Sequence, residues 1–76
     1  MKLYIAHCLD RHIDPVIRVF DTAQGAIDFA KKFVQKEARH PESISEETVR
    51  GWLYHASYSS EGDHVYVTET TLNDAS

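Results

Sequence analysis

Residues 23–38 read AQGAIDFAKKFVQKEA, and this stretch decides the fold. Its apolar residues recur at spacings of three and four, which places them on one side of an α-helix. They are Ala23, Ala26, Ile27, Ala30, Phe33, Val34 and Ala38. The opposite side carries Asp28, Lys31, Lys32, Gln35 and Arg39. We therefore predict one amphipathic helix that packs its apolar side on a sheet.

The flanking residues predict where this helix begins and ends. Asp21 is a good N-cap, and Gln24 three residues later can reach back to the backbone N–H of Asp21, as in a capping box. Thr22 is the second choice of cap. Pro41 stops the helix from continuing, because proline has no backbone N–H and its ring clashes with the preceding turn. We expect the helix to end near Arg39.

Two segments rich in strand-forming residues precede the helix, and two follow it. Residues 2–8 and 16–20 are separated by a turn-rich stretch and predict one hairpin. Residues 49–58 and 65–68 flank a second turn, in which Gly62 can take a positive φ, and predict another hairpin. The acidic connection over 41–47 is predicted as a loop with at most one helical turn.

These elements predict a single α+β domain over residues 1–76. The order is ββαββ, with a four-stranded antiparallel sheet and one helix packed on one face. The pattern does not determine the strand order. A domain of this length usually obtains only about 3–5 kcal/mol from its own core, so self-association is a reasonable expectation.

Cysteine content and the first residues of the chain bear on its location. Cys8 is the only cysteine and can form no internal disulfide, which suits a reducing compartment. Residues 1–20 show neither the pattern of a signal peptide nor an apolar spanning segment. We expect a cytoplasmic protein with no membrane association.

Charge is distributed unevenly along the chain. Residues 1–40 carry a formal charge of +2 and residues 41–76 one of −6, which together make the net charge of −4. The second half is therefore predicted to present an acidic surface. Ordinary solvation explains such residues equally well.

One helix covers only one face of a four-stranded sheet, which leaves the other face open unless a partner binds it. We therefore expect the open face to be the part of the molecule most informative about function. If Leu3, Ile5, Val65 and Val67 point to the helix, strand alternation sends Tyr4 and Tyr66 to the open face. Trp52 and Tyr54 would join them there. The alternative is that Trp52 and Tyr54 belong to the core and Leu53 faces out, because a register change of one residue exchanges the faces.

An aromatic sheet face can bind proteins or stack nucleic-acid bases. Tyr and Trp give a large contact area at low cost in conformational entropy, which favours a protein interface. RNA or single-stranded DNA would need a stripe of lysine and arginine beside the aromatic rings. The second hairpin carries only Arg50 against several carboxylates. We therefore expect a protein partner and no direct contact with nucleic acid.

Potential metal ligands are densest near the first turn, at His7, Cys8, Asp10, His12 and Asp14. His7 and Cys8 point to opposite faces of one strand, and no Cys-x-x-Cys or His-x-x-x-His pair is present. Ser57, Ser59 and Ser60 lie near His55 and Asp63 without a nucleophile elbow or an oxyanion loop. We expect no catalytic residues, no metal and no other cofactor.

Four stretches distinguish this sequence: DRHIDP at 10–15, GWLY at 51–54, EGD at 61–63 and VYV at 65–67. They match no family motif, so no residue role is carried over. In size, acidity, ββαββ pattern and lack of catalytic motifs, the chain resembles the small inhibitors that phages and mobile elements carry, including anti-CRISPR proteins. That resemblance implies an inhibitor that binds a CRISPR effector complex and blocks its access to DNA.

The sequence thus predicts a non-enzymatic inhibitor that docks an acidic and aromatic surface on a nucleic-acid-handling protein complex. The residues predicted to contact the partner are Glu46, Glu47, Glu61, Asp63, Glu69, Trp52, Tyr54 and Tyr66. The alternative is a small housekeeping homodimer of unknown ligand that uses the open sheet face as its interface.

Overall fold

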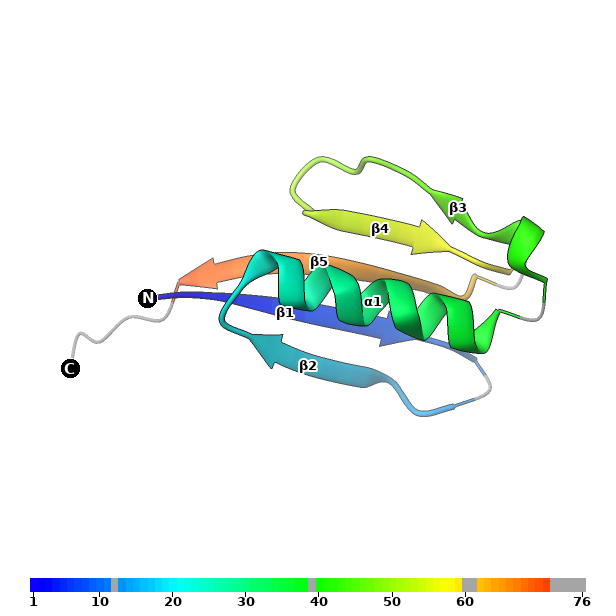
Figure 1. Ribbon diagram of the computed structural model, residues 1–76, viewed down its shortest axis with the longest axis horizontal. Coiled ribbons are helices and arrows are strands. Elements are labelled where there is room, and N and C mark those ends of the chain that lie inside the picture. Colours follow the sequence, from blue (N-terminus) through cyan, green and yellow to red (C-terminus); the bar gives the residue numbers. More distant parts are fainter. Residues whose placement is uncertain (12, 39, 60–61, 72–76) are drawn as a thin grey trace.

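The computed structural model describes residues 1–11, 13–38, 40–59 and 62–71. In chain order the elements are β1 (Lys2–Leu9), β2 (Val16–Phe20), α1 (Ala23–Glu37), the 3₁₀ turn η1 (Pro41–Ser43), β3 (Ser45–Glu46), β4 (Tyr54–Ser57) and β5 (His64–Thr71). The α+β class, the single helix and the antiparallel sheet are as predicted (Figure 1).

The sheet has the order β2-β1-β5-β4-β3, and every neighbouring pair is antiparallel. Both predicted hairpins are confirmed, as β1–β2 and β4–β5. The long strands β1 and β5 form the centre of the sheet and pair from Lys2↔Thr71 to Leu9↔His64. Gly62 has a φ of +96°, as predicted for the turn before β5.

The prediction of four strands is wrong, because the acidic connection contributes a fifth. Ser45 and Glu46 form β3, which pairs with Ser57 and Ala56 at the edge of the sheet. A strand of two residues is too short to show an alternating pattern, so its pairing was not visible in the sequence. β4 is also shorter than predicted, because residues 49–53 form a loop in which Gly51 takes a φ of +92°.

The helix begins one residue later than predicted, with Thr22 rather than Asp21 as its N-cap. Thr22 has an extended backbone, and its hydroxyl oxygen accepts a hydrogen bond from the Gly25 backbone N–H at 3.1 Å. Gln24 does not reach back to the cap, because its side-chain amide donates to Asp28 at 2.8 Å. The last helical residue is Glu37, and the C-cap Ala38 donates its N–H to the Val34 carbonyl.

The identity of the helix N-cap can be tested by replacing each of two adjacent residues. Replacing Thr22 with alanine leaves a helix N–H without its side-chain acceptor, which typically costs about 1 kcal/mol of unfolding free energy. We expect Thr22→Ala to lower the urea midpoint and the matched Asp21→Ala change to have little effect. Equal losses for the two variants would show that the helix is capped differently.

The most deeply buried part of the core between helix and sheet is built from small side chains, and larger, partly buried ones pack around it. The buried residues are Ala6, Cys8, Ala26, Ala30, Val34, Ala56, Tyr58, Val65, Val67 and the polar Asp63. Among the fully buried side chains the largest are only valines and Cys8, so the helix lies close to the sheet. Burial raises the pKa of the Cys8 thiol to about 11, which keeps it protonated and unreactive at neutral pH.

Close packing under the helix also corrects the predicted face assignment of β1. Val65 and Val67 point to the helix as expected, but their cross-strand partners are Cys8 and Ala6, not Leu3 and Ile5. Alternation then places Tyr4 on the helix side, where it packs against the edge of the core. The small residues fit under the helix, and the larger Leu3 and Ile5 lie on the opposite face.

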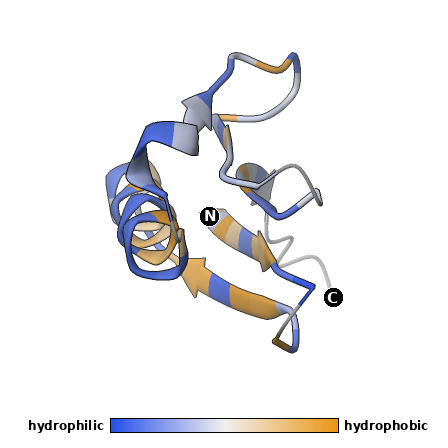
Figure 2. Cartoon of the chain, turned by 90° about the vertical axis from the view of Figure 1, so that its right-hand side faces the viewer, coloured by the Kyte–Doolittle hydropathy of each residue, from blue (hydrophilic) through white to orange (hydrophobic). Residues whose placement is uncertain are grey.

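Helix α1 covers one face of the sheet, and no helix or strand of the described residues covers the other (Figure 2). We call this second surface the open face. In the part of the chain that is described, no helix is long and apolar enough to cross a membrane.

Candidate functional site

The open face carries no charged residue of any strand. The register of the pairs places these strand residues on it: Leu3, Ile5, His7, Leu9, Ile17, Val19, Ser45, His55, Ser57, His64, Tyr66, Thr68 and Thr70. The charged residues of the strands are Lys2, Arg18, Glu46 and Glu69, and alternation places all four on the helix side. The two faces of the sheet therefore differ sharply in charge.

A stack of three rings crosses the middle of the open face. The His7 and Tyr66 rings lie 4.4 Å apart between centroids and are tilted by 8°. The Trp52 ring covers the other side of Tyr66 at 4.1 Å and 14°. Tyr66 thus has both ring faces occupied, and the stack is ordered by its own contacts.

Two more histidines extend this stack into what we call the ring cluster, which comprises His7, Trp52, His55, His64 and Tyr66. The His55 ring lies 5.4 Å from Trp52 and 5.7 Å from His64, and His64 lies 5.9 Å from Tyr66. The members come from β1, β4, β5 and the loop before β4. Pairing of distant segments therefore assembles the cluster.

The three histidines of the ring cluster differ in their polar contacts. His7 Nε2 lies 3.2 Å from the Thr68 hydroxyl, and burial lowers the pKa of His7 from its usual value. His64 Nδ1 lies 2.7 Å from the Gly62 carbonyl oxygen. His55 Nδ1 is buried and has no hydrogen-bond partner among the described residues. A proton on His7 would place charge on a surface that has no strand carboxylate to balance it.

Beside the ring cluster, the outer strand β2 adds an apolar strip to the open face. Ile17 and Val19 are 54% and 58% exposed, although both are large and aliphatic. Their cross-strand neighbours on β1 are His7 and Ile5. The open face therefore has an aliphatic end at β2 and a ring-rich end at β4 and β5.

The structure brings together only two of the predicted aromatic contacts. Trp52 and Tyr66 lie on the open face, as predicted. Tyr54 lies on the helix side, where its hydroxyl donates to Glu46 at 2.5 Å and Lys31 Nζ stands 5.6 Å from its ring centroid. Burial and then the bond to Glu46 raise the pKa of Tyr54 well above its usual range. Tyr54 therefore cannot act together with Trp52 on one flat surface.

The predicted acidic residues do not gather around the aromatic rings. Asp63 is only 4% exposed, and its carboxylate accepts a hydrogen bond from the Arg11 backbone N–H at 2.9 Å. Its place on an acidic surface was a wrong expectation, because burial removes it from contact with any partner. Glu69 pairs with Lys2 at 3.1 Å on the helix side. Glu61 lies outside the described residues.

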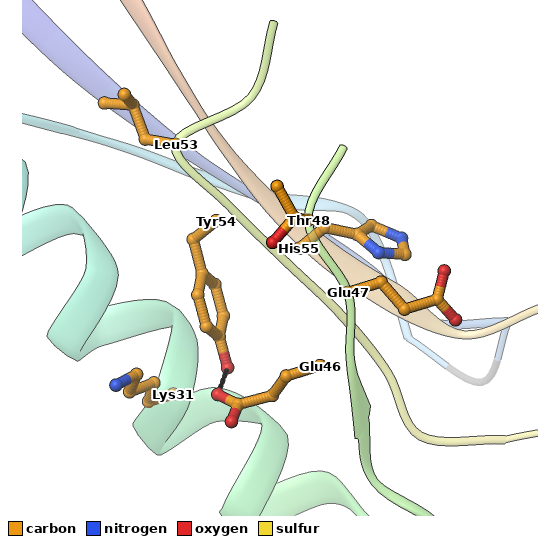
Figure 3. Close-up of a pocket in the computed structure, with 7 residues that line it drawn as sticks. All are labelled: Lys31, Glu46, Glu47, Thr48, Leu53, Tyr54 and His55. Atoms are coloured by element: carbon orange, nitrogen blue, oxygen red, sulfur yellow. Dashed lines mark hydrogen bonds between the residues drawn. The ribbon is translucent and has the colours of Figure 1, made fainter. Parts of the chain in front are cut away.

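An open pocket of about 310 Å³ lies where β3 and β4 separate (Figure 3). Its lining residues are Lys31, Glu46, Glu47, Thr48, Leu53, Tyr54 and His55. Figure 3 shows Tyr54 and Glu46 towards the helix, with His55, Thr48 and Glu47 on the other side. A cation, two carboxylates and a histidine share this small space, so the lining is mixed in charge and favours no single class of ligand.

Sequence reasoning missed the three histidines and the aliphatic pair as parts of one surface. From the sequence alone, His7 is considered as a metal ligand and His55 as a catalytic group, and Ile17 and Val19 are placed in a strand without being assigned to a surface. The alternation of Ile17 and Val19 around Arg18 was a usable signal, because it predicts two apolar side chains on one face of an outer strand. The ring contacts depend on the order β1-β5-β4, which the pattern could not supply.

Within the described residues, no three His, Cys, Asp or Glu side chains form a group that could hold a metal ion. The chain matches no protein-family model, no curated protein and no solved structure.

Proposed function

We propose that the protein is a non-enzymatic protein-binding module whose working surface is the open face. One observation carries this proposal: the sheet displays large uncharged side chains on the face that no helix of the described residues covers. They include Ile17, Val19, Trp52 and Tyr66. Large uncharged side chains gathered on one face are typical of protein interfaces.

The ring cluster favours a protein over a nucleic acid as the partner. A base-stacking platform presents free ring faces, whereas both faces of Tyr66 are covered by His7 and Trp52. The strands also place no lysine or arginine on the open face to bind phosphates.

Inhibition of a nucleic-acid-handling complex, such as a CRISPR effector, is a narrower form of the proposal. It is supported by three exposed carboxylates on the segment around β3, namely Glu42, Glu46 and Glu47. Glu46 lies on the helix side, so such an inhibitor would contact its target with the β3 edge as well as the open face. We place this activity in the cytoplasm, in keeping with the single buried thiol.

A capture experiment with matched variants tests the proposal. Tagged protein is incubated with bacterial lysate that also contains an untagged copy of the chain, and retained proteins are quantified by mass spectrometry. Val19→Lys places a charge on the open face, and Gln35→Lys places the same charge on the exposed side of α1. We expect Val19→Lys to lose the retained proteins and Gln35→Lys to keep them.

Circular dichroism would verify that both variants keep the fold, and Ile17→Lys provides a second open-face change. If no protein, including the untagged copy, is retained in a way that depends on Val19 or Ile17, the open face is not a binding surface.

A further inference from the structure

We infer that the open face binds a second copy of this chain, face to face, in a two-fold symmetric dimer. This inference rests on the proposed function, because it names the partner of the same surface. Three features of the described residues support a second copy: the distribution of charge, the extent of the face and the composition of the core.

Charge favours self-association at this surface above others. The chain has a net charge of −4, so two copies repel each other in most orientations. The strand residues of the open face are uncharged, and the charged ones, Lys2, Arg18, Glu46 and Glu69, lie on the helix side. Two open faces can therefore meet without placing like charges of their strands in contact.

The two ends of the open face complement each other under two-fold symmetry. A two-fold axis that lies between the copies and runs along the strands places β2 of one copy over β4 of the other. Ile17, His7, Tyr66 and His55 stand in one row across the sheet. The same rotation then stacks the aliphatic end of each copy on the ring-rich end of its partner. Aliphatic side chains against aromatic rings form a dry contact of the kind found inside β-sandwiches.

The area of the open face indicates how tightly the two copies should bind. As a flat sheet, strands β2, β1, β5 and β4 span roughly 400 Å², given about 4.8 Å between strands and about 3.4 Å per residue. Side-chain relief and Trp52 increase this area towards the roughly 600 Å² per copy that the smallest specific interfaces bury. The dimer should therefore form in the micromolar range.

The composition of the core gives a reason for the dimer to exist. The most deeply buried side chains are alanine, valine and Cys8, the larger ones around them are mostly only partly buried, and a chain of 76 residues has few other means of stabilisation. Covering Ile17, Val19 and the ring cluster would supply a second apolar layer. The sheet would then be buried on both faces, by α1 on one and by the second copy on the other.

Light scattering coupled to gel filtration, or sedimentation velocity, tests the inference over protein concentrations from about 1 to 200 μM. We expect the unmodified chain to form dimers, with the matched control Gln35→Lys unchanged. Val19→Lys and Ser57→Lys should each weaken the dimer by at least about a hundredfold, because an unpaired ammonium would be buried at two equivalent places. Both side chains lie on the open face, where Val19 is 58% exposed and Ser57 is partly exposed, so both variants should fold.

The outcomes separate the two proposals. A chain that stays monomeric, but whose capture of other proteins depends on Val19, would overturn the dimer and leave the proposed function standing. A monomer with no capture that depends on the open face would overturn both. A dimer broken by Val19→Lys but not by Ser57→Lys would show pairing at the β2 edge and overturn the face-to-face arrangement.

Discussion

Lowering the pH from about 7.5 to about 5.5 should dissociate the dimer, because histidine side chains usually gain a proton below about pH 6.5. The open face of each copy holds His7, His55 and His64 within the ring cluster. A proton on the His7 ring would put positive charge between the two sheets, where the strands of neither open face offer a carboxylate. Because the free monomer can take up protons that the dimer excludes, the dimer is favoured at high pH and lost as the pH falls.

The groups that face these histidines do not offset the effect. His7 has Ile17, Tyr66 and Thr68 as neighbours on the adjoining strands. Burial already lowers the pKa of His7, so its neutral form stabilises the fold above its usual pKa and this contribution is lost on acidification.

His55 and His64 lie in similar surroundings. His64 faces Tyr66 and His55, and His55 faces Trp52 and His64. Glu47 and Lys31 line the same pocket as His55 and carry opposite charges.

The dissociation constant should rise by about tenfold or more over this pH range, since each unit of pKa difference corresponds to a tenfold change. Sedimentation velocity at matched ionic strength measures it. The control is His40→Gln, which changes an exposed histidine beside Glu42 and should keep the full pH response. The triple change His7→Gln, His55→Gln and His64→Gln should abolish the response. A dimer that is equally strong at both pH values would show that these rings are not in the interface.

Removing the carboxylate of Asp63 should destabilise the fold by about 1–3 kcal/mol, because the Arg11 backbone N–H would lose its charged acceptor in a partly buried hydrogen bond. Asp63 accepts from the Arg11 N–H with its side chain and from the Tyr58 N–H with its carbonyl oxygen. The side-chain bond joins the β1–β2 turn to the β4–β5 turn across 52 residues of sequence. For a domain whose free energy of unfolding is roughly 5 kcal/mol, such a loss is a large fraction of the total stability.

Urea denaturation at one fixed protein concentration measures the effect, because association adds to apparent stability. Asp63→Ala should show the full loss and Asp63→Asn a smaller one, since an amide oxygen still accepts a hydrogen bond. The matched control is Glu69→Ala, which breaks an exposed ion pair with Lys2 and should leave the midpoint nearly unchanged. A midpoint for Asp63→Ala equal to that of Glu69→Ala would show that Asp63 does not join the two turns.

The elements of this fold were predictable because each carries its own local signal. The three- and four-residue spacing over 23–38 indicated the helix, and turn residues between apolar runs indicated both hairpins. The choice of face was not predictable in this way. On β1, Leu3, Ile5 and His7 alternate with Tyr4, Ala6 and Cys8, and both sets are largely apolar. Only the packing of the helix decides between the two sets, and the helix packs on the set that contains Ala6 and Cys8.

Asp63 shows a second limit of local reasoning. In sequence it belongs to a turn with Glu61 and Gly62, and a turn of this kind usually lies in solvent. Its partner is a backbone N–H at Arg11, which has no side-chain signature and lies far away in the chain. The ring cluster was hidden for the same reason, because its five members belong to segments that meet only once β5 lies between β1 and β4.

The pairing of β1 with β5 also constrains how the chain can fold during synthesis. Lys2 pairs with Thr71, so the centre of the sheet waits for nearly the last residues of the described chain to leave the ribosome. Until then β1 has only β2 beside it, and an isolated two-stranded hairpin is marginally stable in water. The long loop between β1 and β5 must close before the contacts between these strands can form. The entropy lost in closing it slows folding compared with a helical protein of the same length. Throughout elongation the nascent chain therefore holds β1 without its β5 partner, and a chaperone that binds short aliphatic segments would find Leu3, Ile5 and Leu9 there.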